Sequence, residues 1–207
     1  MLKILSIEKY KGSTKKIEFE NGNVEFINSQ IIAEFNLKDG QNLPESAWEE
    51  IKAENDFRKA KERALYLLDY KDYSYVELFK KLNRNYSDDI CYRVMDKMVE
   101  IGAINDRRYA SALARHYVEV KKFGRFKAFQ QMKLKGLTNE VINEALDRYD
   151  DSTYERLKEL TEKKIDKYLD SENGIAKLKN YLVRQGYSYG LVKDAVNEVL
   201  CEIEDEN

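Results

Sequence analysis

The side chains that most often carry out enzyme chemistry are scarce in this sequence. It contains one histidine, His116, and two cysteines, Cys91 and Cys201, which are far apart and belong to no C-x-x-C pair. A Ser-His-Asp or Cys-His enzyme would have to use His116, and a metal site would have a single histidine to recruit. The cysteine spacing predicts neither a disulfide scaffold nor a cysteine zinc site, and it suits a reducing compartment.

Two acidic pairs, Asp88-Asp89 and Asp150-Asp151, are the remaining candidates for metal or acid–base chemistry. Each lies beside a predicted helix start, where the positive end of the helix dipole favours a carboxylate, so the structural interpretation is preferred. The sequence contains no GxxxxGK[ST], GxGxxG or HExxH motif. We therefore predict a protein that is not an enzyme, with no catalytic residue, no cofactor and no metal.

Basic side chains, by contrast, gather in one part of the chain. The net charge is −2, yet residues 106–137 contain nine basic and two acidic residues, whereas residues 151–207 contain nine basic and thirteen acidic residues. A basic centre in an acidic chain predicts an anionic partner. The predicted partner- or nucleic-acid-binding residues are the bases of this centre: Arg107, Arg108, Arg115, Lys121, Lys122, Arg125, Lys127, Lys133 and Lys135.

Three of these bases, Arg108, Arg115 and Lys122, are seven residues apart. On a regular helix this spacing forms one stripe, with its members about two turns apart. Such a stripe could follow a phosphate backbone or an acidic groove on a protein, and the alternative is a solvated helix face. Tyr109 and Tyr117 accompany the stripe at a spacing that also suits a core face, and we expect Tyr109 in the core.

The elements that position these residues begin with a small sheet. Ile17 and Phe19 alternate with acidic residues, and Val24 and Phe26 repeat the pattern after Asn21-Gly22. An Asn-Gly pair between alternating runs predicts a hairpin with a two-residue turn, and residues 2–10 could add a third strand. Such a sheet is too small to be stable alone, so it must pack on helices or on a partner.

Helical patterns follow to residue 202, and they repeat. Tyr86, Leu137 and Tyr187 lie 51 and then 50 residues apart, and each precedes a Ser or Thr that can cap a helix. Apolar residues recur four and eight positions after each of them. The pattern predicts three repeats of about 50 residues, each a three-helix unit.

The same segments resemble the RecX family of RecA modulators. The resemblance rests on S-x-x-E-L-x-x-K-L from Ser74 to Leu82, on Gly102-x-Ile104-Asn105-Asp106 followed by Tyr109-Ala110, and on weaker matches in the third repeat and the N-terminal strands. Two departures occur. Asn85 replaces a frequent Gly in a turn that is one residue short, and Phe126-Lys127-Ala128 follows Gly124-Arg125, where members often have a further Gly or Pro and an Arg.

The resulting expectation is a mostly α protein with three tandem three-helix repeats in an elongated, curved array, preceded by a β-hairpin or three-stranded sheet. The predicted domains are residues 1–42, the N-terminal hairpin region; 43–104, a linker helix and the first repeat; 105–150, the basic second repeat; and 151–207, the third repeat with an acidic end. The longest apolar runs span only a few residues, and no signal peptide is apparent, so we expect a cytoplasmic protein outside the membrane.

The resemblance implies a regulator that lodges in the RecA filament on single-stranded DNA and hinders its extension, ATP hydrolysis and strand exchange. Single-stranded DNA is a possible second partner through the basic repeat, and we expect a monomer. Two other functions remain open: a helix-turn-helix protein that acts directly on DNA, and a helical scaffold for another protein.

Overall fold

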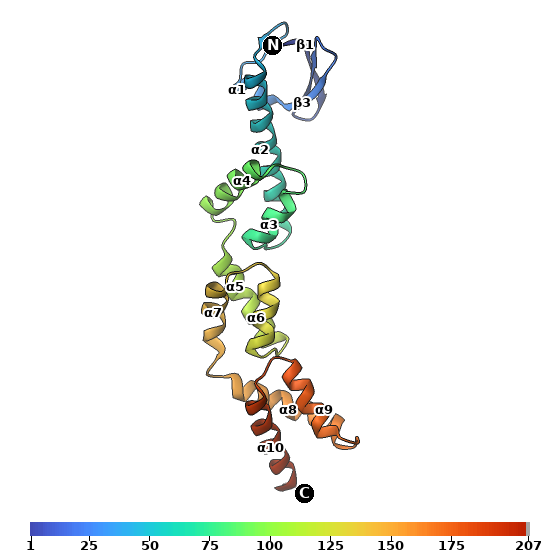
Figure 1. Ribbon diagram of the computed structural model, residues 1–207, viewed down its shortest axis with the longest axis vertical. Helices are drawn as coiled ribbons and strands as arrows, with labels where there is room; N and C mark the ends of the chain where they lie inside the picture. Colours follow the sequence, from blue (N-terminus) through green and yellow to red (C-terminus); the bar gives the residue numbers. More distant parts are fainter. Residues whose placement is uncertain (206–207) are drawn as a thin grey trace. The chain divides into compact units, whose positions relative to one another are not determined.

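The computed structural model describes residues 1–205 and is mostly helical, with a small N-terminal sheet, as the sequence predicts (Figure 1). It divides into two compact units, Met1–Lys71 with Leu78–Ala103, and Asp72–Glu77 with the chain from Ile104 onward. The elements are β1 (Leu2–Lys11), β2 (Thr14–Phe19), β3 (Val24–Asn28), α1 (Ser29–Glu34), β4 (Asn42–Leu43), α2 (Glu45–Tyr70), α3 (Tyr75–Leu82), α4 (Asp88–Glu100), α5 (Asp106–Arg115), the π-turn η1 (His116–Val120), α6 (Arg125–Leu134), α7 (Asn139–Leu146), the 3₁₀ turn η2 (Asp147–Tyr149), α8 (Thr153–Leu169), α9 (Gly174–Arg184) and α10 (Tyr189–Asp205).

The sheet has four antiparallel strands in the order β3-β2-β1-β4. The predicted third strand is β1. The fourth, β4, was not predicted: it pairs only Leu2 with Leu43 and Lys3 with Asn42, and two residues are too few to produce a periodic pattern.

The predicted two-residue turn at Asn21-Gly22 is wrong, and the error reverses one face of β3. The turn is wider: Gly22 donates its N–H to the carbonyl of Phe19 and alone has a positive φ, +85°. Glu18 therefore pairs with Val24, one step away from the register that a two-residue turn would impose. A slip of one residue moves every side chain to the opposite face. Val24 and Phe26 are consequently exposed, and Ile27 is buried in their place.

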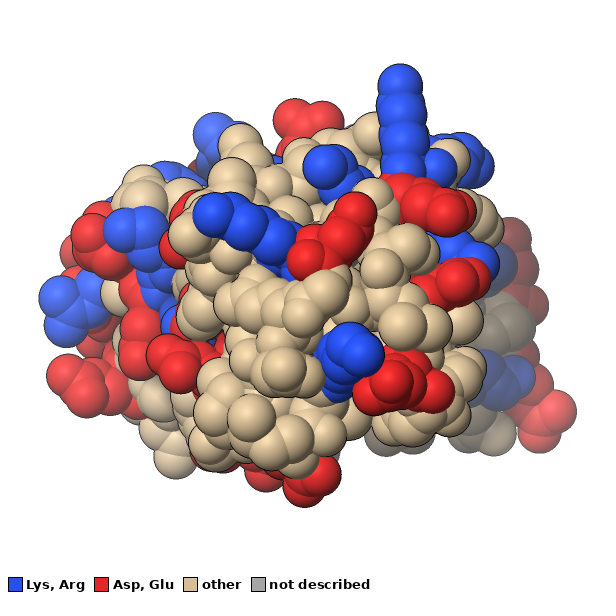
Figure 2. Space-filling model, turned by 90° about the horizontal axis from the view of Figure 1, so that it is seen from above, with Lys and Arg blue, Asp and Glu red and all other residues tan. Residues whose placement is uncertain are grey.

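The buried face of the sheet packs on α2. Ile4, Ile17, Phe19, Trp48 and Ile51 belong to one apolar core, in which the rings of Phe19 and Trp48 meet edge to face at 4.8 Å. Seen from the end that carries the sheet, acidic and basic side chains are interspersed around an area of uncharged side chains (Figure 2).

Helix α2 also covers the outer edge of the sheet. The buried Asn55 accepts a hydrogen bond from the N–H of Asn28 and donates one to the carbonyl of Phe26. These two groups belong to edge strand β3, so the side chain replaces the missing neighbouring strand.

The three predicted repeats are present as α2-α3-α4, α5-α6-α7 and α8-α9-α10. The last helix of each starts at the predicted place, after Ser87, Thr138 or Ser188, and the hydroxyls of Thr138 and Ser188 accept hydrogen bonds from the N–H groups three residues later. Equivalent positions of these helices are buried in each repeat: Cys91, Ile142 and Val192; Val94, Ala145 and Ala195; Met95, Leu146 and Val196.

The short turn noted in the first repeat has a clear geometry. Gly136 and Gly186 end α6 and α9 with positive φ values of +79° and +94°. In the first repeat Asn85 is absent from the residues with positive φ, and both Asn85 and Tyr86 donate to the carbonyl of Leu82. The turn of the first repeat is one residue shorter, and it therefore lacks the residue of positive φ that glycine supplies in the other two repeats.

No helix within residues 1–205 is long and apolar enough to cross a bilayer.

Candidate functional site

The residues that could support catalysis lie apart from one another or serve the fold. His116 is exposed on η1, and Cys91 is fully buried, where burial and the nearby Asp88 carboxylate raise the pKa of its thiol. Asp88 and Asp89 occupy the first turn of α4, as expected for residues that favour a helix start. Within residues 1–205, no cluster of three or more His, Cys, Asp or Glu side chains could hold a metal ion.

The nine predicted basic residues all belong to the second repeat, but they differ in what they contact. Arg107, Arg108 and Arg115 lie on α5, and Lys121 and Lys122 follow η1. The other four lie on α6 or at its end: Arg125, Lys127, Lys133 and Lys135.

The predicted stripe does not extend to Lys122. Regular α-helix ends at Arg115, and the π-turn η1 then changes the number of residues per turn. Lys122 has a left-handed φ of +54°, its carbonyl accepts a hydrogen bond from the hydroxyl of Tyr187 at 3.1 Å, and its Nζ lies 4.0 Å from Glu159. The seven-residue spacing assumed a continuous helix, and the π-turn breaks it.

Arg125 is held inside the second repeat. Its guanidinium makes ion pairs with Asp147 at 2.6 Å and Asp150 at 2.9 Å, and it donates to the side chain of Asn143. Partial burial lowers the pKa of Arg125, but the hydrogen bonds to the two carboxylates outweigh it, so the pKa lies above its ordinary value. Arg125 thereby ties the start of α6 to the end of α7.

Lys135 joins the second repeat to the segment Asp72–Glu77. Its Nζ lies 3.2 Å from the carboxylate of Glu77, which also accepts a hydrogen bond from the hydroxyl of Tyr109 at 3.3 Å. Burial and the neighbouring Glu77 raise the pKa of Tyr109. Tyr109 is half-buried and packs against the core of the second repeat, which confirms its expected place.

Ser74 completes this contact, which we call the first junction (residues 74–77 with 135–137). Ser74 and Glu77 form a capping box at the start of α3: the Ser74 hydroxyl accepts from the N–H of Glu77, and the Glu77 carboxylate accepts from the N–H of Ser74. The hydroxyl of the fully buried Ser74 also donates to the carbonyl of Lys135. The S-x-x-E motif therefore caps a helix and binds the next repeat at the same time.

The equivalent contact between the second and third repeats is the second junction (residues 124–127 with 185–187). Gly124 donates its N–H to the carbonyl of Gln185 at 2.8 Å, and Lys127 donates to the side chain of Gln185 at 2.9 Å. The ammonium of Lys127 also lies 4.1 Å from the centre of the Phe123 ring. Lys127 therefore has partners inside the protein, as Lys135 does at the first junction.

The remaining bases face solvent. Arg107 is exposed and pairs with Glu144 at 3.3 Å, and Arg108 is exposed on the same turn. Arg115, Lys121 and Lys133 are exposed, and no carboxylate within residues 1–205 forms a salt bridge with them. These exposed side chains are the part of the predicted set that a partner can reach.

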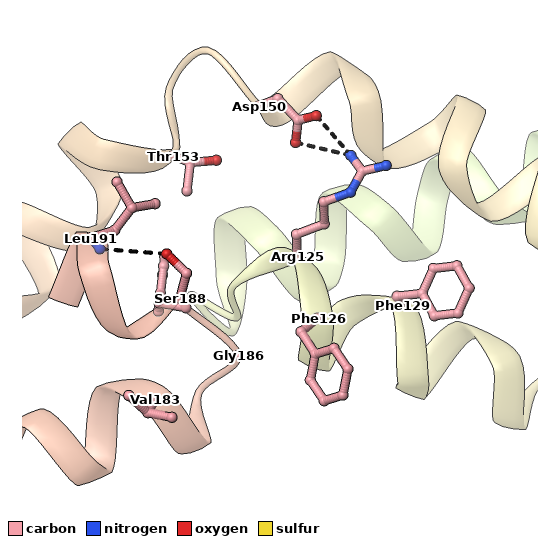
Figure 3. Close-up of a pocket in the computed structure, with 10 residues that line it drawn as sticks. Arg125, Phe126, Phe129, Asp150, Thr153, Val183, Gly186, Ser188 and Leu191 are labelled. Atoms are coloured by element: carbon pink, nitrogen blue, oxygen red, sulfur yellow. Dashed lines mark hydrogen bonds and ion pairs between the residues drawn. The ribbon is translucent and has the colours of Figure 1, made fainter.

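The second junction also contains a groove that sequence reasoning missed. It has a volume of about 770 Å³ and lies between the start of α6, the start of α8 and the turn from α9 to α10 (Figure 3). Its walls are largely apolar: Phe126, Phe129, Val183, Tyr187 and Leu191. The one hint in the sequence was Phe126, which follows Gly124-Arg125 at a place where family members often have a further Gly or Pro and an Arg.

Comparison with known proteins gives three matches to family models. Residues 60–98, 105–146 and 150–196 match the first, second and third three-helix domains of RecX, and together these cover more than half of the chain. The chain is 28% identical to the regulatory protein RecX of Clostridioides difficile strain 630, over 83% of this chain and 82% of that one. It is 24% identical to the RecX of Bacillus subtilis strain 168, over 87% and 70%.

Two solved structures are similar to the whole chain or much of it. A crystal structure of a regulatory protein RecX superposes with a TM-score of 0.73 at 21% identity, over 96% of this chain and all of that one, which bears on the fold. The crystal structure of RecX from Lactobacillus salivarius superposes with a TM-score of 0.65 at 25% identity, over 70% of this chain and 96% of that one.

Proposed function

This chain belongs to the RecX family, and on that premise we propose that it binds the RecA recombinase filament on single-stranded DNA and inhibits its extension, ATP hydrolysis and strand exchange. It acts as a cytoplasmic monomer, by binding alone and without a reaction of its own. Its place is in the regulation of recombination, DNA repair and the SOS response.

The observation that carries this proposal is the set of exposed bases on the second repeat. Arg108, Arg115, Lys121 and Lys133 face solvent in a chain whose net charge is −2. Local basic residues steer the protein toward an anionic partner, and the net negative charge of the chain limits its binding to other polyanions. A recombinase filament on DNA offers both acidic protein surface and phosphate.

The repeat architecture supports the same proposal. The second and third repeats have separate apolar cores, and the family models match all three repeats as distinct domains. Repeats joined in tandem can contact successive protomers of a filament. Each further contact then forms at a high effective concentration, so weak contacts sum to firm binding.

The experiment that tests the proposal measures RecA ATP hydrolysis on single-stranded DNA with increasing amounts of this protein. We expect the wild-type protein to lower the rate. The variant Arg115→Glu/Lys121→Glu/Lys133→Glu should require roughly tenfold more protein for the same effect, because like charges then face the anionic partner. A matched control reverses three exposed lysines of α8, Lys163, Lys164 and Lys167, and should inhibit like the wild type.

Circular dichroism of both variants checks that the helices are intact. No inhibition by the wild-type protein would contradict the proposed function. Equal inhibition by both triple variants would show that Arg115, Lys121 and Lys133 do not contribute to binding the filament.

Direct DNA binding is a second candidate, which the same bases favour. Affinity for naked single strands should then fall with salt, with a log–log slope of about −0.7 per phosphate contacted. Because few exposed bases are available, we expect a dissociation constant in the micromolar range or weaker at physiological salt. Tight binding to a duplex sequence, without RecA, would favour the helix-turn-helix function instead.

A further inference from the structure

The groove at the second junction is an open apolar site. Phe126 keeps 69% of its surface exposed at the entrance, and Val183 keeps 38%. Phe129, Tyr187 and Leu191 also line the groove, and Gly186 contributes no side chain to it. Figure 3 shows Phe126, Val183 and Leu191 around the opening. Apolar surface gathered in a concave site of this size is typical of a place where another molecule binds.

The first junction indicates what kind of group fits such a place. There Val76, two residues after the helix cap Ser74, packs directly on Gly136: a Cβ added to this glycine would lie 2.6 Å from the Cβ of Val76. At the second junction the residue two positions after the cap is Phe126, but the neighbour of Gly186 is Lys127 instead. An apolar side chain of the protein itself therefore covers the first site, and Phe126 leaves the second one open.

The charges around the groove restrict its occupant. Residues 120–139, which include α6, contain six basic and no acidic side chains, and residues 173–193, which include α9 and the start of α10, contain four basic and none acidic. The third wall contributes Asp150, whose carboxylate is paired with Arg125, as is that of Asp147. Helices α6 and α9 thus contain no acidic side chain, and their exposed bases Lys133, Lys177 and Arg184 attract negative charge, whereas on the third wall Arg125 offsets one of the two carboxylate charges that it binds.

We propose that this groove binds a short acidic segment of a partner protein, with one apolar side chain of that segment inserted between Phe126, Val183 and Leu191. The carboxylates of the segment lie over the basic side chains of α6 and α9. Apolar burial supplies the affinity, and the acid-free walls supply the preference for an acidic segment over a basic one. This binding is separate from the proposed action on the recombinase, because it needs neither filament nor DNA.

The test measures fluorescence anisotropy with the full chain and no recombinase. The probe is a fluorescein-labelled peptide of four aspartates followed by leucine and phenylalanine. Two control peptides replace either the two apolar residues with serine or the four aspartates with lysine. We expect the probe to bind at least tenfold more tightly than either control peptide, and less tightly as salt is raised.

Two variants of the groove, Phe126→Ala and Val183→Asp, should each weaken probe binding roughly tenfold. Leu134→Ala is the matched control, because Leu134 is an even more exposed apolar residue of α6 and does not line the groove. Phe126 and Val183 face solvent in part, so the variants should keep the wild-type circular dichroism spectrum.

Equal binding of the probe and the serine control, or equal loss in Leu134→Ala and Phe126→Ala, would overturn the proposal. A labelled oligothymidine is measured in parallel. If Phe126→Ala weakens oligothymidine binding and leaves peptide binding unchanged, the groove receives nucleic acid bases, and the peptide proposal is wrong. The proposed recombinase function is tested separately by ATP hydrolysis, so the failure of one leaves the other standing.

Discussion

The two junctions use the same backbone positions and different side chains. In both, the residue three positions after a helix cap contacts the residue that ends the middle helix of the next repeat. Glu77 binds Lys135 at the first junction, and Lys127 binds Gln185 at the second. A glycine with positive φ follows that residue each time. At the first junction the buried hydroxyl of Ser74 donates to a backbone carbonyl, and at the second the backbone N–H of Gly124 does so.

This difference shows how one repeat can serve two purposes. A serine and a valine make the first junction a network of side-chain contacts. A glycine and a phenylalanine bring two backbones together at the second and leave a groove beside them. Tandem repeats can therefore keep a common connection while one connection is changed into a binding site.

The largest expected effect comes from a methyl group at Gly124. The added Cβ would lie 2.4 Å from the backbone carbon and oxygen of Gly186, and a backbone cannot move aside as a side chain can. We expect Gly124→Ala to lower the free energy of unfolding by about 3 kcal/mol. Urea unfolding followed by circular dichroism measures it.

Gly136→Ala is the matched substitution at the first junction, where the obstacle is the side chain of Val76. We expect a loss of about 2 kcal/mol, which a Val76→Ala background reduces only in part, because alanine removes the two γ-carbons of Val76 but keeps its Cβ, and the strain of the positive φ also remains. If Gly124→Ala costs no more than Gly136→Ala, the two junctions do not differ in the way described.

Glu77 and Lys127, each three positions after its helix cap, should also contribute differently to the free energy of unfolding. Glu77→Ala removes half of a capping box, an ion pair to Lys135 and the acceptor for Tyr109, and we expect a loss of about 1–2 kcal/mol. Lys127→Ala removes one hydrogen bond and a contact with a ring, and we expect less than about 1 kcal/mol. Thermal unfolding of the two variants, with an exposed lysine such as Lys163→Ala as control, compares them.

A third pair compares Val76→Ala with Phe126→Ala. The partly buried Val76 packs on Gly136, so its truncation should cost about 1 kcal/mol, whereas Phe126 is mostly exposed and should cost less than about 0.5 kcal/mol. Urea midpoints measure both. A larger loss for the phenylalanine would mean that Phe126 supports the fold and that the groove is a by-product of packing.

The smallest expected effect is a dependence on pH at Asp106, which accepts a hydrogen bond from the N–H of Tyr75 in the first junction. Burial raises the pKa of Asp106, an effect that the Tyr75 N–H opposes and the Glu77 carboxylate increases. A carboxyl group with a raised pKa in the folded state binds its proton more tightly there, so its contribution to stability falls as pH rises from about 4 through that raised value. Asp106→Asn keeps an acceptor for Tyr75 and has no charge to lose.

We therefore expect Asp106→Asn to gain stability relative to the wild type between about pH 4 and pH 7, as measured by urea unfolding at several pH values. A stability difference that is constant over this range would show that the ionisation of Asp106 does not contribute. Asp88→Asn, at an exposed helix start, is the control.

Much of the fold could be predicted because each repeat has a strong local pattern. The spacing of Tyr86, Leu137 and Tyr187 and the hydroxyl that follows each of them located three helix starts correctly. Turn geometry was less accessible, because the Asn-Gly pair is compatible with two loop lengths, and the choice between them decides which way Val24 and Phe26 face.

The candidate site was predictable only in part, because composition records charge and not partners. The sum over residues 106–137 treats Arg125 and Lys121 alike, yet Arg125 is held by two carboxylates that follow it by more than twenty residues. Likewise a π-turn is invisible to a seven-residue spacing, so Lys122 was assigned to a stripe that it does not join. These distinctions need the distances between side chains, which no count supplies.

The hydrogen bonds of Asn55 to edge strand β3 can form only after α2 has been synthesised, so the sheet exists in the growing chain before the helix that covers its edge. Asn55 follows Asn28 by 27 residues, and Trp48 and Ile51, which complete the core of the sheet, also come later. A growing chain that has left the ribosome only as far as residue 42 exposes the apolar side of its sheet and the open edge of β3. Both can pair with other nascent chains until α2 emerges. A pause in translation just after the sheet would therefore favour aggregation, whereas a pause after α2 would leave the sheet covered.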